Sequence, residues 1–410
     1  MTPPRVTQQI FTRLVGGAKP TLVTELVERE LRELRQDEIL VEMLYVSLHG
    51  SFWLASHPAL LHPRKEEFIE SGGFVFGNSG VGRVVASETP ATGVGDYVTV
   101  FGHAPCGRDD CHACSVLHRY VECEFGKSTI IGHGRGAHDG TYARHAILPR
   151  YSYEVCYRAV ERPDEAALVP FMYAFLLADV RNALTRHPET LKNHRMLLFG
   201  AGHAGHVAAY IHLRSSPLAR LVVVESSPTR AASLKKLAPD AVEVYVPDKE
   251  IIERLNSGHA RESEWHERDE TIDGIVETMR EHFGGRLCNV LFDASSGNTV
   301  PLWDNPRVLS PGCHCIPFGF GSDGLVLSRE LIQVSGLTFL TSRGVGDLAN
   351  RREVIDVIRG DGSHFVRHYL KGASRCLGNL DEAIAFIGEQ HALPGMLHEV
   401  PHAYMTLNGI

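Results

Sequence analysis

The chain has 410 residues, of which 43% are hydrophobic and 22% charged, with a formal net charge of −8. These values are ordinary for a folded protein of two or three domains, and the acidic balance does not favour binding to nucleic acid or to an anionic membrane. The N-terminal residues lack the continuous apolar segment of a signal peptide, and no apolar run approaches the roughly 20 residues that span a bilayer. We therefore expect a cytoplasmic protein that binds neither nucleic acid nor membrane.

The first chemical signal along the chain is a group of cysteines. Four of the nine lie within 18 residues: Cys106, Cys111, Cys114 and Cys123. An odd cysteine count in a long chain does not fit a secreted disulfide framework. Four thiolates on one short segment suit a closed tetrahedral Zn²⁺ site with a structural role. The alternatives are four free thiols, or a site in which the flanking His103 or His112 replaces one ligand.

The second signal is a glycine-rich loop between a strand and a helix. The apolar run 196–199 predicts a buried parallel strand, the sequence GAGHAG follows at once, and small or apolar residues then continue at helical spacing. In such a loop the glycines allow a tight turn, close approach of the backbone to a pyrophosphate, and close helix–strand packing. The N-terminus of the helix favours phosphate binding. The pattern predicts a dinucleotide site.

A second strand supports this interpretation. The apolar run 221–224 ends in Glu225, which lies 20 residues beyond Gly205, where a carboxylate would bind the ribose hydroxyls. A carboxylate would repel a 2′-phosphate, so NAD(H) is favoured over NADP(H), although the nearby Arg230 weakens that preference. The alternative is a glycine-rich turn in an unrelated α/β protein. We predict that the following residues bind the cofactor: Gly200, Gly202, His203, Ala204, Gly205, Glu225 and Arg230.

Further strands alternate with helical segments over the next 120 residues. Runs 242–246, 288–293 and 337–340 are predicted strands, and 310–312 (SPG) is a predicted turn. Residues 248–285 are highly charged and predict one or two solvated surface helices, as an insertion without a functional role. Strands that alternate with helices indicate a doubly wound parallel sheet.

The order of these motifs resembles the medium-chain dehydrogenase/reductase superfamily, which includes zinc alcohol dehydrogenases and quinone reductases. The resemblance covers nearly the whole chain. Segments similar to family motifs are VEMLYV at 41–46, GVGRVVA at 80–86, GDYV at 95–98, DGTYA at 139–143, EAAL at 165–168 and SPG at 310–312. The cysteine group resembles the family's structural zinc lobe with a first gap two residues longer. Residues 380–387 resemble its last amphipathic helix.

This resemblance implies an α/β fold with two domains. Residues 1–165 would form a GroES-like, β-rich catalytic domain that carries the four-cysteine lobe. Residues 166–348 would form a Rossmann domain with a doubly wound parallel sheet, and residues 349–410 would return to the catalytic domain. The active site would lie between the domains. The family resemblance also implies a homodimer in which edge strands around Phe318 and 337–340 pair across a two-fold axis.

The positions that hold the family's catalytic zinc carry different residues here. His49 stands in place of the cysteine and Asn78 in place of the histidine, while the third position falls near 168–170, an apolar segment. One histidine and one amide do not make a catalytic site of three protein ligands and a water. We infer that there is no catalytic zinc. A site rebuilt from His49 with His57, His103 or His145 is the alternative.

One catalytic position is retained, because Ser51 stands where family members carry the hydroxyl that passes the alcohol proton. Without a metal, hydrogen bonds must polarise the carbonyl and a side chain must handle the proton. Ser51, His49 and Asn78 are the predicted catalytic residues, with His49 able to act as acid or base. The alternative is that His49 and Asn78 only fill the space left by the metal.

Three functions remain open at this stage. The first is NAD(H)-dependent interconversion of an alcohol and a ketone on a small polar metabolite without a catalytic zinc. The second is zinc-independent NAD(P)H reduction of an activated C=C or C=N bond. The third is a nucleotide-binding protein without catalysis. The retained Ser51 favours the first, and the loss of the zinc ligands favours the second. Fold alone does not name the substrate.

Overall fold

The computed structural model describes residues 3–15, 21–48, 72–125, 128–132, 138–192, 194–248, 265–295, 307–319, 336–340, 344–391 and 403–407. His49, Ser51 and His57 lie outside these residues. The chain divides into two compact units, one of residues 1–178 with 344–410 and the other of residues 179–343. The divisions expected from the sequence, at 165/166 and 348/349, differ from these because the first unit extends into helix α5 (Ala174–Thr185).

The first unit is built on a seven-stranded sheet in the order β10-β6-β5-β3-β18-β17, with β9 also paired to β3. Its pairs are antiparallel except for β17 and β18. The strands are β3 (Glu38–Leu48), β5 (Gly80–Ser87), β6 (Tyr97–Val100), β9 (His145–Pro149), β10 (Tyr153–Tyr157), β17 (Arg375–Leu377) and β18 (Ala403–Thr406). The central β3 is buried along its whole length apart from Glu42, which explains its apolar sequence.

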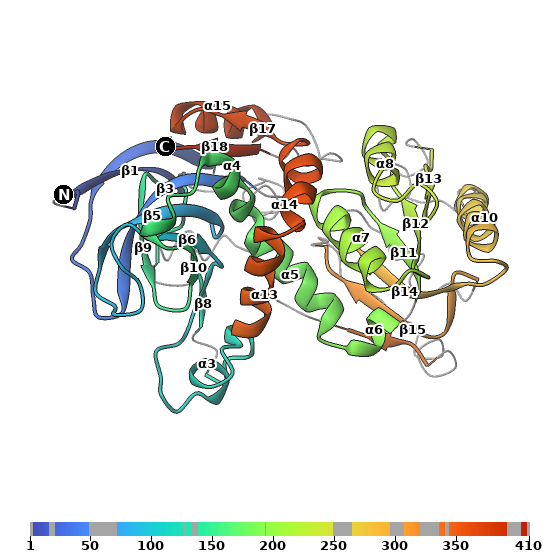
Figure 1. Ribbon diagram of the computed structural model, residues 1–410. Coiled ribbons are helices and arrows are strands. Elements are labelled where there is room, and N and C mark those ends of the chain that lie inside the picture. Colours follow the sequence, from blue (N-terminus) through green and yellow to red (C-terminus); the bar gives the residue numbers. More distant parts are fainter. Residues whose placement is uncertain are drawn as a thin grey trace. The chain divides into compact units, whose positions relative to one another are not determined.

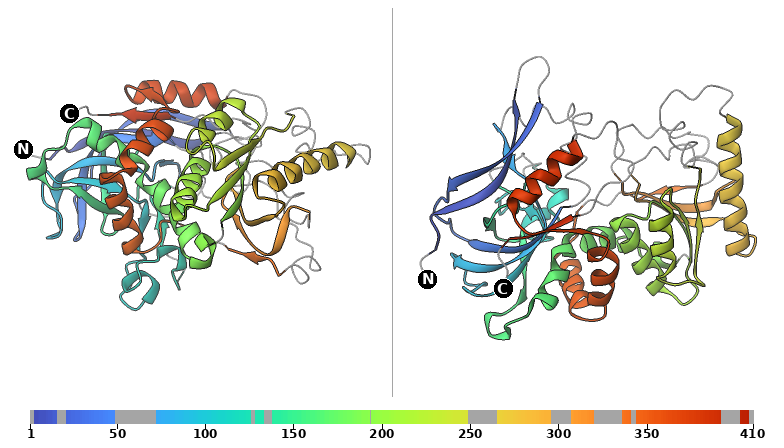
Figure 2. Two further views of the ribbon diagram at one scale, coloured as in Figure 1. Left: turned by 45° about the vertical axis from the view of Figure 1, so that its right-hand side comes forward. Right: turned by 90° about the horizontal axis from the view of Figure 1, so that it is seen from above.

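A second sheet, in the order β2-β1-β4, packs on the same core. Its strands are β1 (Val6–Val15), β2 (Thr21–Glu30) and β4 (Phe74–Val75). Helix α15 (Leu380–His391) lies beside this hairpin (Figure 2). Leu380, Ala383 and Ile387 recur at helical spacing and are buried in the shared core, so the predicted amphipathic helix is confirmed.

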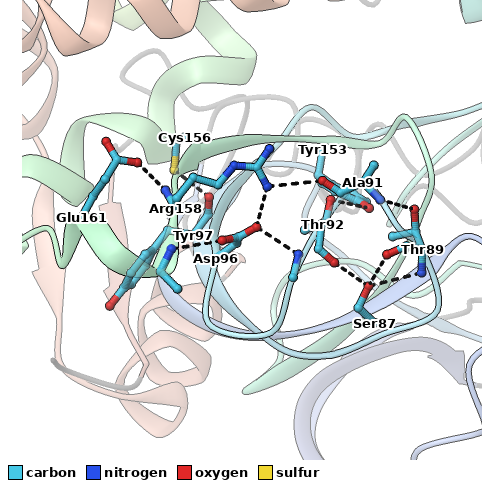
Figure 3. Close-up of polar contacts among 12 residues, drawn as sticks. Ser87, Thr89, Ala91, Thr92, Asp96, Tyr97, Tyr153, Cys156, Arg158 and Glu161 are labelled. Atoms are coloured by element: carbon cyan, nitrogen blue, oxygen red, sulfur yellow. Dashed lines mark hydrogen bonds and ion pairs between the residues drawn. The ribbon is translucent and has the colours of Figure 1, made fainter.

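The turn before β6 is fixed by a buried carboxylate (Figure 3). Asp96 accepts hydrogen bonds from the Gly93 amide at 3.0 Å, the Ala159 amide at 3.0 Å and Arg158 Nη1 at 2.8 Å. Burial acts to raise the pKa of Asp96, but these hydrogen bonds outweigh burial and lower the pKa below its usual value. The carboxylate therefore ties the turn at 93–96 to the segment that follows β10.

Two short strands and two short helices form a separate lobe of the first unit. They are β7 (His103–Ala104), α3 (His112–Ser115), η3 (Tyr120–Glu122) and β8 (Thr129–Ile130). The lobe has its own small core of Cys111, Ala113, Cys114 and Tyr120. The cysteines of the predicted metal site are thus part of the packing of this lobe.

The remaining helices of the first unit come from both of its chain segments. They are η4 (Ala159–Glu161), α4 (Glu165–Leu168), η5 (Val169–Tyr173), α5, α13 (Leu348–Arg359), α14 (Gly362–Phe365) and η7 (Val366–Lys371). The stretch Glu165–Thr185 has the length and apolar composition of a membrane span, which the sequence analysis missed. Of its most apolar window, 72% is buried inside the protein, as in the core helix of a folded domain, so it is weak evidence for a span.

The second unit is a six-stranded parallel sheet in the order β13-β12-β11-β14-β15-β16. Its strands are β11 (Arg195–Phe199), β12 (Arg220–Val224), β13 (Val242–Tyr245), β14 (Cys288–Asp293), β15 (Leu309–Pro317) and β16 (Thr338–Phe339). Its helices are α6 (Pro188–Lys192), α7 (His203–Ser215), α8 (Pro228–Lys235) and α10 (Trp265–His282), with α7 and α10 on opposite faces of the sheet (Figure 1). The predicted doubly wound parallel sheet is confirmed.

One prediction about this unit was wrong and another was incomplete. Residues 310–312 lie inside β15, where the register shifts opposite 288–290 and Gly312 has φ +74°, so they form a bulge and not a turn between elements. The charged segment contains α10, whose Ile272, Ile275 and Met279 are buried against the sheet. This helix is a core element with one solvated face. The charged side chains concealed the apolar spacing.

Candidate functional site

The glycine-rich loop joins β11 to α7 at the carboxyl end of the parallel sheet. Gly200 has φ +84°, a conformation that favours glycine, and its amide donates to the Val224 carbonyl at 3.0 Å. Gly202 is the N-cap of α7 and has no side chain with which to cap the helix. A Cβ at Gly205 would overlap the carbonyl oxygen of Gly200. The three glycines therefore make the tight turn and close helix–strand packing that the sequence predicted.

Glu225 follows β12 and holds this loop from the neighbouring strand. Its Oε2 accepts from the Ala201 amide at 2.5 Å and its Oε1 from the Ser227 amide at 2.8 Å. Its side chain is buried, with 5% of the residue exposed. The carboxylate thus lies against the glycine-rich loop, and its position is set by two backbone donors.

The other predicted cofactor residues lie along the first turns of two helices. His203 and Ala204 open α7, the former buried and the latter half-buried. Arg230 is half-buried on α8, where its amide lies 3.5 Å from the Ser227 hydroxyl. Sequence reasoning did not single out His206, whose Nδ1 contacts the Gly202 carbonyl at 3.0 Å and whose Nε2 contacts the Ser233 hydroxyl at 3.2 Å. His206 links the loop to α8.

The ends of β14 and β15 close on the same loop. A Cβ at Gly200 would lie 3.1 Å from the amide nitrogen of Ser295, and one at Gly319 would overlap the Ser295 carbonyl. The Gly319 amide donates to the Asp293 carbonyl at 2.7 Å, and the Ser295 hydroxyl donates to the Asp293 carboxylate at 2.7 Å. Sequence reasoning did not assign the small residues after β14 to the site. Their position after a predicted parallel strand could have assigned them, because ligands of such sheets bind outside the carboxyl ends of the strands.

In the first unit, Asn78 lies in a segment that its neighbours hold rigidly. The Thr141 amide donates to the Gly77 carbonyl at 2.9 Å, and the Thr141 hydroxyl donates to the Ser79 carbonyl at 2.7 Å. A Cβ at Gly102 would lie 2.5 Å from the Asn78 carbonyl oxygen. Asn78 is 3% exposed, so its side chain lies in a buried setting. The segment 139–143, recognised by its resemblance, provides this frame.

The Asn78 segment and the segment 139–143 both lie beside the end of β3, the strand that precedes His49 and Ser51 in the sequence. The Ser79 hydroxyl lies 3.5 Å from the Ser47 carbonyl, and the Tyr142 hydroxyl lies 3.4 Å from the same atom. Asn78 is therefore close in space to the last described residues before His49. The third metal-ligand position was predicted near 168–170, and Leu168, Val169 and Pro170 are all buried apolar residues.

Two of the histidines considered for a rebuilt metal site have other surroundings. Nδ1 of His103 contacts the Phe101 carbonyl at 3.0 Å, and the ring stacks on Phe175 at 5.8 Å between centroids. Burial lowers the pKa of His103 to about 4. His145 lies on β9, paired with Glu42 of β3, and burial lowers its pKa. Within the described residues, neither histidine belongs to a group of three or more potential metal ligands.

The four cysteines do form such a group. The Sγ atoms of Cys106, Cys111, Cys114 and Cys123 all lie within 4.8 Å of one another, and those of Cys111 and Cys123 are 3.9 Å apart. A tetrahedral Zn²⁺ site with Zn–S bonds of ~2.3 Å separates its sulfurs by about 3.8 Å, so a small contraction would bring all four into place. The flanking His112 is exposed and outside this group. The gap between Cys106 and Cys111 is longer than in the family, yet Cys106 still lies beside the other three cysteines.

Comparisons with known proteins identify solved structures that share this fold. No protein-family model and no curated protein sequence matches the chain. Solved structures do match over its whole length. An alcohol dehydrogenase from Thermotoga maritima is 16% identical, with a TM-score of 0.69 over 98% of this chain and 100% of that one. An acetophenone reductase from Geotrichum candidum in complex with NAD is 15% identical, with a TM-score of 0.67 over 99% and 98%.

A crotonyl-CoA carboxylase/reductase in complex with NADP is also similar, with 15% identity and a TM-score of 0.72 over 100% of this chain and 96% of that one. At these identities the similarity establishes the fold. The chain has the fold of medium-chain alcohol dehydrogenases and reductases, with a GroES-like unit and a Rossmann unit.

Proposed function

We propose that this protein is a nicotinamide-dependent oxidoreductase of the medium-chain type, which interconverts an alcohol and a ketone on a small polar metabolite without a catalytic metal. The observation that carries the proposal is the loop at 200–205. It combines a left-handed glycine, a glycine N-cap and a glycine in contact with the strand, at the carboxyl edge of a parallel sheet. This arrangement is a binding site for a dinucleotide pyrophosphate.

The residues fit such a cofactor at three places. The first turn of α7 presents backbone amides and the positive end of the helix dipole to the phosphates. Glu225, already held by two amides, presents its carboxylate to the adenosine ribose. The backbone of 293–295 and 318–319 lines the edge where the nicotinamide would lie. When bound, the nicotinamide supplies or accepts a hydride.

Glu225 also supports a preference for NAD(H). The carboxylate is buried and fixed against the loop, so a 2′-phosphate there would meet an unscreened negative charge. Arg230 is the counter-argument, because a guanidinium on α8 is suited to bind a phosphate. The two cofactors differ by that one group, so direct titration with NADH and NADPH decides between them.

For substrate activation we propose Asn78 together with His49 and Ser51. The Asn78 amide is held by a rigid frame and can donate a hydrogen bond to a carbonyl oxygen as negative charge develops on it. The hydrogen bond of Ser79 to Ser47 brings the Asn78 segment to the end of β3, the strand that precedes His49 and Ser51 in the sequence. His49 would take up or release the proton, and the Ser51 hydroxyl would pass it to the substrate oxygen.

The four-cysteine lobe is proposed to hold one structural Zn²⁺. The separations of its sulfurs support this, because the four Sγ atoms lie within 4.8 Å of one another. Four thiolates leave no position for substrate, so this ion would stabilise the lobe and take no part in the chemistry.

A second function has a specific observation in its favour. Three structures of crotonyl-CoA carboxylase/reductases have TM-scores of 0.71 to 0.73, above the values of 0.69 and 0.67 for the alcohol dehydrogenase and the acetophenone reductase. Reduction of an activated C=C bond needs no Lewis acid at the site proposed here. This alternative makes the substrate an enoyl compound and leaves the loop and Glu225 in the same roles.

The test combines metal content, cofactor binding and turnover. We expect one zinc per chain by elemental analysis, tighter binding of NADH than NADPH, and turnover on a panel of ketones and secondary alcohols. Asn78→Ala should lower kcat by about 10²–10³ with NADH affinity unchanged, whereas the control Asn379→Ala, at a position exposed before α15, should change neither. Two zincs per chain would refute the metal-free mechanism. Turnover on enoyl compounds alone would favour the second function over the first.

We also propose a homodimer. Among the described strands, β16 is the last of the parallel sheet and pairs with β15. The last strand of such a sheet can pair with the same strand of a second copy about a two-fold axis. Sedimentation equilibrium on the wild type would test this: we expect twice the mass of the 45.2 kDa chain, and the mass of a single chain would contradict the dimer.

A further inference from the structure

Arg351 is among the most deeply buried large side chains of the described chain, with 1% of its surface exposed. It lies in the first turns of α13, and the next residue, Arg352, is exposed. Its Nη1 donates to the Tyr151 carbonyl at 2.5 Å. Within the described residues, Nε and Nη2 have no hydrogen bond of good geometry. A buried guanidinium in this condition is costly unless negative charge lies nearby.

The surroundings of the guanidinium lead directly to the four-cysteine lobe. Arg351 Cζ lies 4.9 Å from the centroid of the Tyr120 ring and 5.7 Å from that of Phe101. Tyr120 belongs to the same small core as Cys111 and Cys114, and Tyr151 packs against that core. A single layer of side chains therefore separates the guanidinium from the thiols.

In the part of the chain that the structure describes, no carboxylate forms a hydrogen bond or an ion pair with the Arg351 guanidinium. The carboxyl group that acts most strongly on Arg351 is Glu154 of β10. Burial raises the pKa of Glu154, while Arg351 and Arg352 act to lower it. Arg352 and Arg150 add positive charge on the same side, as their effect on His118 shows. Asp347 at the N-cap of α13, and Asp37 at 3.7 Å from Arg150, offset part of this positive charge without forming a hydrogen bond to the Arg351 guanidinium.

A Zn²⁺ ion with four thiolates carries two surplus negative charges. We propose that Arg351 is the positioning and charge-compensating residue of this centre, offsetting the thiolates across Tyr120 and fixing the lobe to α13 through Tyr151. The inference rests on the metal site proposed above. It makes metal loading and the docking of α13 mutually dependent, although the two segments are more than 200 residues apart in the chain. Figure 1 shows α13 beside the lobe that contains α3.

Four variants separate charge compensation from simple packing. Arg351→Met keeps a long apolar stem and removes the charge and the donors. Arg351→Lys keeps the charge, and Arg351→Gln keeps donors without charge. Arg352→Met removes an exposed charge from the next position of the same helix. If only packing matters, Gln and Lys should behave alike, and this comparison remains informative if the Met variant does not fold.

The experiment measures zinc release from the full-length protein into excess chelator, with a metallochromic dye as reporter. We expect Arg351→Met and Arg351→Gln to lose zinc about 10–100-fold more readily, which is the usual effect of removing a partner of metal ligands. Arg351→Lys should restore most of the affinity, and Arg352→Met should match the wild type. Hydrogen exchange provides a second measurement: removal of zinc from the wild type should raise exchange in α13 and leave α15 unchanged.

The outcomes distinguish this inference from the metal site itself. If the wild type holds no zinc, or if Cys114→Ser holds as much as the wild type, the metal site is wrong. If the wild type holds one zinc and Arg351→Gln retains it as well as Arg352→Met does, the metal site stands and the role of Arg351 is refuted. Equal release from the Lys and Gln variants would likewise refute charge compensation.

Discussion

Replacement of Gly205 by alanine tests the proposed cofactor loop most directly. Gly205 lies in α7, and a Cβ built there would be 3.0 Å from the Gly200 carbonyl carbon and closer still to its oxygen. Such approaches are tighter than real Cβ contacts, so α7 and the loop would have to separate. Forcing an extra methyl group into a packed site costs about 1–3 kcal/mol, while alanine recovers about 0.5–1 kcal/mol of helix propensity.

We therefore expect Gly205→Ala to lose up to about 2.5 kcal/mol of stability, the difference between those two effects. The larger effect should fall on cofactor binding, because the displaced turn carries the amides that face the pyrophosphate. We expect NADH affinity to fall at least about tenfold, which corresponds to about 1.4 kcal/mol. Urea unfolding and NADH fluorescence titration measure the two quantities.

Gly388→Ala is the matched control. Gly388 is an exposed glycine in α15, and a Cβ there would meet nothing within 4 Å. The same substitution should raise stability by up to about 1 kcal/mol and leave NADH affinity unchanged. Gly205→Ala protein that binds NADH as tightly as the wild type would refute the assignment of this loop to the pyrophosphate.

Three further predictions concern the first unit. Asp96→Asn should cost about 1–3 kcal/mol of stability at neutral pH. Because the pKa of Asp96 is lowered in the folded state, its contribution is present above the unfolded pKa and disappears as pH falls through the folded pKa. The acid unfolding curves of the mutant and the wild type should therefore converge at low pH. His103 is neutral in the folded state down to about pH 4, whereas the unfolded state binds a proton below about 6.5. As the pH decreases from about 6.5 to about 4, the stability of the wild type should therefore fall by up to about 3 kcal/mol. Thermal melts of His103→Gln should lack that part of the pH dependence. The side-chain amide of Asn350 donates to the Ala178 and Val345 carbonyls at 2.9 and 2.8 Å. Asn350→Asp sets a carboxylate against these two carbonyls, so it should lower the melting temperature more than Asn350→Ala does. The reverse order of melting temperatures would contradict these contacts.

The sequence by itself determined the elements whose signals are local. An apolar run, a glycine-rich loop and small residues at helical spacing identified β11 and α7, and a second run ending in an acid identified β12 and Glu225. These patterns work because a parallel strand is buried on both faces and because only glycine suits the turn at Gly200. The cysteine spacing likewise indicated a metal site before the sulfurs were seen to lie within 4.8 Å.

Other features depend on contacts between distant segments, and only the tertiary structure decided them. The sequence reads α10 as a charged surface segment, yet one of its faces completes the core of the parallel sheet. The predicted turn at 310–312 is a bulge because β14 and β15 pair out of register there. Arg351 and Arg352 are adjacent and identical in type, but the first is buried beneath the cysteine lobe and the second is exposed. Burial of a charge is set by what packs over it from elsewhere in the chain, and no local pattern encodes that.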